Sequence, residues 1–297
     1  MKIKFHTVIW GREYMDFFFK VCMPFTIREL SKVDCQPEFI FNTIIPDAYR
    51  IKDEMKGLNY SIYAFDKERI IEPQVILFEC VQKFIEMNAG KDCYIKILGA
   101  DVLYYGMSNM INLLKKHPKY KAAALPIGAI RVDREQWEKK YKGEHTIEEL
   151  FLLTMETMHQ ETKDHFITSK RFHPYPAMIL APNINGLRVN SFIAQPSFMK
   201  PNRYVPFTNP EYDLLNNNFA IEDVYIVNDM HEAFDISPAP AYANWSENTF
   251  TPEKMSEFIK TKDLNPFMRR CFEHGFNKSD YPEHMDEIVK QVMGGIK

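Results

Sequence analysis

The chain has 297 residues, of which 45% are hydrophobic and 26% are charged, a composition typical of a folded globular protein rather than of a disordered one. Its formal net charge is −3, and no run of Lys and Arg is long enough to follow a phosphate backbone, so we do not expect nucleic acid as a partner. Five widely spaced Cys without a CxxC motif argue against a disulfide framework or a zinc site and favour a reducing compartment.

The first residues lead directly into a strand pattern, without the apolar core of a signal peptide. Apolar stretches are interrupted by Lys20, Pro24 or Pro46, far short of the roughly 20 residues that a membrane span requires. We therefore expect a cytoplasmic protein without an integral membrane span.

Segments with strand and helix patterns alternate over the first 130 or so residues. Strands are expected at 2–9, 38–45, 60–65, 94–98, 122–125 and 129–132. Helices are expected at 14–25, with a kink or break at Pro24, at 75–85 and at 107–114. This alternation predicts an α/β fold with an open, mostly parallel sheet flanked by helices. Ligands of such sheets bind beyond the carboxyl ends of the strands, which places residues 7–11, 43–47 and 99–105 around one crevice.

The pattern changes after Arg131. Residues 134–145 are polar and predict an exposed loop, whereas Thr146 and Glu149 form a capping box that begins a helix over 147–158. The stretch 165–218 is irregular and rich in Pro and Asn, with one strand candidate at 187–193, and it is interpreted as a lid or binding segment. A strand follows at 223–227. We expect 1–132 and 133–245 to be two halves of one domain, and 246–297 to be a helical C-terminal extension.

Asp101 is the first candidate for a functional residue. It follows an apolar strand directly, in Gly99-Ala100-Asp101, so its carboxylate is expected to point into the crevice. There it could hold a divalent cation that bridges a diphosphate, or accept hydrogen bonds from a ribose. The alternative is a helix cap or a loop salt bridge.

Three short segments resemble bacterial glycosyltransferases of the type A nucleotide-diphospho-sugar fold. They are Phe-His-Thr-Val-Ile-Trp-Gly at 5–11, Gly-Ala-Asp at 99–101 and Ala-Leu-Pro-Ile-Gly-Ala-Ile-Arg at 124–131. The resemblance covers roughly residues 3–132 and, more loosely, 165–235. It implies transfer of a sugar from a nucleotide-diphosphate donor to a hydroxyl of a carbohydrate or lipid-linked acceptor, with the nucleotide against Thr7 and Trp10. Trp10 could equally be a core residue.

The resemblance also suggests roles for later residues. Asp229 and His231 follow the strand at 223–227 and could act as catalytic base or as a further metal ligand. The alternative is that they belong to a solvated turn with a helix cap. His173, in a Pro-rich loop, could donate to the diphosphate, and Arg131 and Arg188 could neutralise it as it leaves. Each of these three has the plainer alternative of a surface or structural role.

One position departs from the family pattern. The usual second acidic residue, two positions after Asp101, is Leu103 here. The resemblance implies Mn²⁺ or Mg²⁺, and a single carboxylate is a poor site for either ion. The alternative to a transferase is therefore a non-catalytic α/β binding or interaction module that keeps the fold. Motifs of other classes, namely G-x-G-x-x-G after the first strand, Walker A, G-x-S-x-G and H-E-x-x-H, do not occur.

Overall fold

The computed structural model describes residues 1–125, 128–159, 162, 178–183, 186–191, 195–208, 213–229, 231–239, 267 and 270. The chain divides into two compact units, each built from two segments. The first comprises Met1–Ala123 and Pro196–Tyr225, and the second comprises Ala124–Gln195 and Ile226–Lys297. The helices expected within 246–297 lie outside the described residues, apart from the helical positions Phe267 and Arg270.

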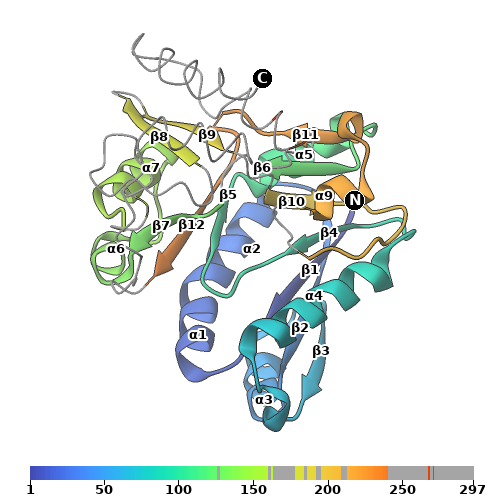
Figure 1. Cartoon of the computed structure of the whole chain (residues 1–297). Helices are drawn as coiled ribbons and strands as arrows, with labels where there is room; N and C mark the ends of the chain where they lie inside the picture. The colour runs from blue at the N-terminus through green and yellow to red at the C-terminus, as the bar shows by residue number, and fades with distance from the viewer. Residues whose placement is uncertain are drawn as a thin grey trace. The chain divides into compact units, whose positions relative to one another are not determined.

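A seven-stranded sheet, to which the first unit contributes most residues, has the order β11-β6-β10-β4-β1-β2-β3 (Figure 1). Its strands are β1 (Lys2–Val8), β2 (Gln36–Ile44), β3 (Tyr60–Phe65), β4 (Tyr94–Ile97), β6 (Ala122–Leu125), β10 (Gln195–Met199) and β11 (Val224–Ile226). The pairs β1–β2, β1–β4 and β2–β3 are parallel, whereas β10 runs antiparallel to β4. The predicted α/β fold with a mostly parallel sheet flanked by helices is confirmed.

The other elements of the first unit are mainly helical. They are α1 (Arg12–Phe17), η1 (Phe18–Cys22), α2 (Met23–Ser31), α3 (Ile45–Glu54), η2 (Lys67–Arg69), α4 (Pro73–Asn88), the short strand β5 (Leu103–Tyr105), α5 (Met107–Lys116), α9 (Leu214–Asn218) and η3 (Ile221–Asp223). The sequence did not predict α3, because Pro46-Asp47 was interpreted as the end of a strand. Both residues also suit the first turn of a helix, which needs no N–H from Pro and favours a carboxylate.

The helix is not split at Pro24, one of the two outcomes expected there, and its irregularity is a π turn just before the proline. α1, η1 and α2 follow one another without interruption, and η1 is a π-helical turn placed directly before Met23 and Pro24. Pro cannot donate a backbone hydrogen bond within a helix. The wider π turn absorbs this irregularity, so the helical path continues past the proline.

The two faces of the sheet differ in polarity because side chains alternate along each strand. On one face Phe41 of β2 meets Phe18 of η1 edge to face, with ring centroids 6.1 Å apart. The other face carries Lys4 and His6 of β1, and Figure 1 shows α4 running alongside β1, β2 and β3 there. The ring of His6 stacks on Phe84 of α4 at 4.4 Å. Helix α4 therefore covers a partly polar sheet surface.

The second unit contains β7 (Ile130–Asp133), α6 (Arg134–Lys140), α7 (Ile147–Glu156), β8 (Met178–Asn183), β9 (Gly186–Ser191) and β12 (Phe234–Ala239). Strands β7 and β12 pair in parallel, and β8 and β9 form an antiparallel hairpin.

Two predictions for the second half of the chain need correction and one is confirmed. Residues 134–145 are not all loop, because α6 begins there and buries Trp137 completely. The stretch 165–218 is less irregular than expected, since its described part includes β8, β9, β10 and α9. The capping box is present at α7: Glu149 N–H donates to Thr146 Oγ1 at 3.2 Å, and Thr146 N–H donates to a Glu149 carboxylate oxygen at 2.9 Å.

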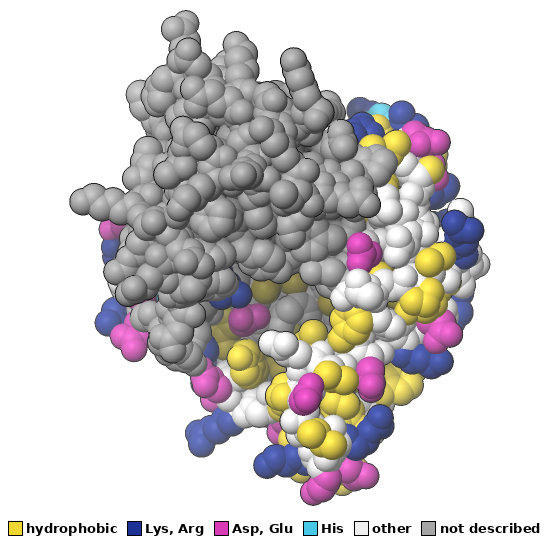
Figure 2. Space-filling model, in the orientation of Figure 1, with side chains coloured by type: hydrophobic (Ala, Val, Ile, Leu, Met, Phe, Trp, Pro, Cys, Tyr) yellow, Lys and Arg dark blue, Asp and Glu magenta, His cyan; other side chains and the backbone are white. Residues whose placement is uncertain are grey.

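Hydrophobic, basic and acidic side chains are interspersed over the described part of the face that Figure 2 shows. Among the helices that the structure describes, no helix has both the length and the apolar composition of a bilayer-spanning segment.

Candidate functional site

A cavity of about 530 Å³ lies where β1 and β4 end. Its wall contains the last residue of β1 and the two that follow it (8–10), and the last residue of β4 and the four that follow it (97–101). The remaining lining comes from Tyr14, Pro73, Gln74, Leu77 and Val81. Its volume lies within the usual range of small-molecule pockets, about 300–1,000 Å³. The sequence placed residues 7–11, 43–47 and 99–105 around one crevice; the structure brings parts of the first and third segments to one pocket, whereas residues 43–47 do not line it.

The loop after β1 is fixed by contacts to β2 and α3, and Ile9 N–H donates to the carbonyl oxygen of Asn42 in β2 at 2.9 Å. Gly11 has φ 83° and donates its N–H to Asp47 Oδ2 at 2.7 Å. Beside this contact, Asp16 of α1 pairs with Arg50 of α3 at 2.7 Å, and the hydrogen bond from Arg50 lowers the pKa of the Asp16 carboxyl. The left-handed φ favours glycine because other residues meet steric strain there. The pocket wall at Trp10 is therefore held by the start of α3.

The loop after β4 is held equally closely. Gly99 donates its N–H to the hydroxyl of Tyr104 at 2.5 Å, and the thiol of Cys22 contacts the carbonyl oxygen of Ala100 at 3.7 Å. A Cβ atom added at Gly99 would lie 2.8 Å from Cγ2 of Val102, closer than such atoms approach. Any larger residue at position 99 would therefore have to displace the side chain of Val102 in the turn that precedes β5.

Aromatic and aliphatic side chains dominate the pocket. Trp10 packs its ring edge to face with Phe65, with centroids 6.0 Å apart. Tyr14, at the start of α1, is 53% exposed. Trp10 and Tyr14 form an apolar wall together with Leu77 and Val81 of α4, and this wall suits a flat ring. Asp101 also lines the pocket, and its carboxylate is a hydrogen-bond acceptor.

The described residues do not make a metal site around Asp101. Asp101 is half-buried in the turn after β4, whereas Leu103, at the position of the expected second acid, is 0% exposed in β5. Within the described part of the chain, no group of three His, Cys, Asp or Glu side chains is placed to hold a metal ion. Mn²⁺ or Mg²⁺ would need further oxygen ligands, so this set of side chains does not fit either ion.

The other predicted site residues are distributed over both units. Thr7 is buried in β1 and does not line the cavity. Arg131 is an exposed residue of β7, and Arg188 belongs to β9, both in the second unit. His173 lies outside the described residues.

Asp229 and His231 lie together in a tight turn of the second unit. Asp229 Oδ1 accepts a hydrogen bond from the backbone N–H of His231 at 2.8 Å, and its carbonyl accepts one from Glu232 N–H at 3.0 Å. Asp side chains commonly close turns in this way. This contact accounts for Asp229 as a turn residue, and a role as catalytic base stays a prediction.

Sequence reasoning missed the contribution of α4 to the pocket. Val81 was assigned no role beyond helix packing, and Gln74 and Leu77 were not considered. The available signal was Pro73, which marks the start of a helix just after the third strand. The first turns of a helix that covers a parallel sheet lie near the ends of the strands. Which of their side chains reach a pocket there depends on tertiary packing, which the sequence pattern does not show.

In comparisons with known proteins, no protein-family model matches the chain and no curated protein sequence matches it.

Proposed function

We propose that the cavity at the ends of β1 and β4 binds a nucleotide-diphosphate sugar, and that the protein transfers this sugar to an acceptor hydroxyl. The observation that carries the proposal is the meeting of Trp10 and Asp101 in one pocket of about 530 Å³. An apolar wall next to a carboxylate suits a nucleoside, whose base is flat and whose ribose carries hydroxyl donors. The resemblance of residues 5–11 and 99–101 to type A glycosyltransferases supports the same assignment.

In this proposal the base stacks against Trp10 and Tyr14, and Asp101 accepts hydrogen bonds from the ribose. The acceptor oxygen forms a bond to the anomeric carbon, the bond from that carbon to the diphosphate oxygen breaks, and the nucleoside diphosphate leaves. The hydroxyl proton passes to a general base. The protein contributes by positioning the donor in a pocket that excludes water from the base.

A thermal-shift panel of nucleotide sugars and nucleoside diphosphates, with and without Mn²⁺, tests donor binding. A ligand at about 100 times its Kd adds about 2.7 kcal/mol to the free energy of unfolding, which corresponds to roughly 4–5 °C in a chain of this size. We expect one nucleotide class to raise the Tm of the wild type, and Trp10→Ala and Asp101→Asn to abolish that shift.

Matched controls come from the exposed surface of α3. Tyr49→Ala removes an aromatic ring that is 73% exposed, and Asp53→Asn removes an exposed carboxylate that pairs with the neighbouring Lys56. Both variants should keep the wild-type shift. If no nucleotide shifts the wild type, or if the control variants lose the shift as well, the donor site is wrong.

The alternative, binding without transfer, is favoured by one observation. Leu103 is fully buried where the family carries its second acid, so no carboxylate can be added at that position without repacking β5. A nucleotide shift without release of nucleoside diphosphate, in the presence of candidate acceptors, would select this alternative.

A further inference from the structure

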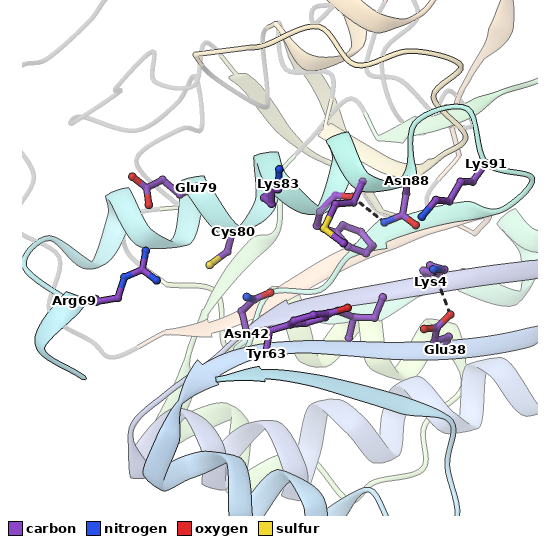
Figure 3. A pocket seen from close by; sticks show the side chains of 13 residues that line it. Lys4, Glu38, Asn42, Tyr63, Arg69, Glu79, Cys80, Lys83, Asn88 and Lys91 are labelled. Atoms are coloured by element: carbon purple, nitrogen blue, oxygen red, sulfur yellow. Dashed lines mark hydrogen bonds and ion pairs between the residues drawn. The ribbon is translucent and has the colours of Figure 1, made fainter. Parts of the chain in front are cut away.

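A second pocket, of about 510 Å³, lies between α4 and the polar face of the sheet. Figure 3 shows its labelled side chains in two rows, one from α4 and the loops at its ends, and the other from β1, β2 and β3. A smaller adjoining pocket shares five of its residues: Asn42, Tyr63, Arg69, Glu79 and Cys80. The groove is elongated, because Cys80 and Asn88 are eight residues apart on one helix, or about 12 Å along its axis.

The strand register explains why polar groups gather in this groove. Lys4 pairs with Glu38 across β1 and β2, and Asn42 pairs with Tyr63 across β2 and β3. Neighbours in register project from the same face of a sheet. Lys4 and Glu38 also form an ion pair at 3.5 Å, so these two charges are already balanced.

Two positively charged side chains of the groove, Arg69 and Lys91, have no such ion pair among the described residues. Lys83 pairs with Glu86 at 2.9 Å, but neither Arg69 nor Lys91 forms an ion pair with any side chain in the described part of the protein. Figure 3 shows these two residues at opposite ends of the groove. Each therefore offers charged N–H donors to an anionic group.

The groove also presents acceptors and a ring. Asn88 is 3% exposed, and its Nδ2 donates to the carbonyl oxygen of Phe84 at 2.8 Å. Its Oδ1 is buried without a hydrogen-bond partner among the described residues, and a buried acceptor of this kind is costly unless a donor reaches it. Glu79 adds carboxylate oxygens, and the 51% exposed ring of Tyr63 adds an aromatic surface.

We propose that this groove is a second binding site, for a hydroxylated anion of the size of a sugar acid or a sugar phosphate. Arg69 or Lys91 binds the anionic group, and Asn88 and Glu79 accept hydrogen bonds from hydroxyls. The ring of Tyr63 packs on an apolar face of the ligand. This binding requires no transfer chemistry, and the proposal does not rest on the function proposed for the other pocket.

Calorimetric titration with glucuronate, glucose 6-phosphate and glucose tests the proposal. We expect at least one of the two anions to bind at least tenfold more tightly than glucose. The anion that binds more tightly shows whether the site prefers a carboxylate or a phosphate. Arg69→Gln or Lys91→Gln should weaken that binding about 10- to 100-fold, the usual effect of losing one charged hydrogen bond. The affected variant identifies the end that holds the anion.

The control is Lys52→Gln, which removes an exposed charge from α3, outside the groove. It should bind as the wild type does, and all three variants should melt at the wild-type temperature because their side chains lie at the surface. Trp10→Ala should leave the binding of the anion unchanged, which separates this site from the donor pocket. No saturable binding of either anion, equal binding of glucose, or unchanged binding in both groove variants would overturn the proposal.

Discussion

At the scale of single residues, His6 is the clearest case of a polar side chain forced into the interior by strand alternation. It is fully buried, its Nε2 lies 2.7 Å from Asn42 Oδ1, and its Nδ1 has no partner within the described part of the chain. Burial lowers the pKa of His6 to about 4, and the hydrogen bond to Asn42 offsets only part of this effect. The imidazole is therefore neutral in the folded protein at neutral pH.

This burial predicts a specific acid sensitivity. The unfolded chain binds a proton at His6 near pH 6.5, and the folded protein binds it only near pH 4. The stabilising contribution is therefore complete above pH 6.5, is lost as the pH falls to 4, and amounts to about 3 kcal/mol. Urea unfolding at pH 7 and pH 4 should show this extra loss in the wild type but not in His6→Phe, which retains a ring against Phe84. Equal losses in the two proteins would contradict the assignment.

The candidate site could be predicted from the sequence only in part. Trp10 and Asp101 were found because each directly follows an apolar strand, and strand ends of a parallel sheet share one edge. Tyr14, Gln74 and Leu77 were not found, because a helical pattern shows which residues share a face but not which part of that face remains open. Leu103 was recognised as a departure, and the structure adds that this side chain faces the core.

At the scale of elements, predictions were best where local pattern and packing agree. β1, β2 and α5 have unbroken periodicity and were predicted within a few residues. β10 was missed because it lies within a Pro- and Asn-rich stretch, and its place beside β4 depends on a partner about 100 residues earlier. α6 was missed because its seven residues are mostly charged, and only Trp137 marks its buried side.

The capping box of α7 allows a local test. Thr146→Ala removes the acceptor for Glu149 N–H and should destabilise the start of α7 by about 1 kcal/mol. Hydrogen exchange at the first-turn amides of α7 should accelerate about fivefold in this variant. Thr146→Ser keeps the hydroxyl and should exchange as the wild type does. An unchanged rate in Thr146→Ala would show that fraying of this turn does not depend on the cap.

At the scale of the whole molecule, the sheet is not built from a continuous stretch of chain. β10 lies between β4 and β6, and β11 lies outside β6, yet both come from residues after 194. The sequence predicted 1–132 as one half of a domain, and the first compact unit instead combines Met1–Ala123 with Pro196–Tyr225. The alternation of elements along a chain cannot show that a later strand enters between two earlier ones.

This topology predicts that a fragment of residues 1–132 does not fold on its own. Without β10, β4 and β6 lose the strand between them, and their backbone groups lack partners. We expect no cooperative urea transition by circular dichroism. A chain in which a Gly/Ser linker joins 1–132 to 195–229 restores β10 and β11 and should regain a sigmoidal transition. Cooperative unfolding of 1–132 alone would contradict this interpretation of the sheet.

Helix α4 is a wall of both pockets. Leu77 and Val81 line the cavity at the strand ends, and Cys80 and Phe84 line the groove over the polar sheet face. A ligand that displaces this helix in one pocket alters the shape of the other, and such a coupling is reciprocal: each ligand changes the affinity of the other by the same factor. The two sites would then communicate through about two turns of α4, from Leu77 to Phe84.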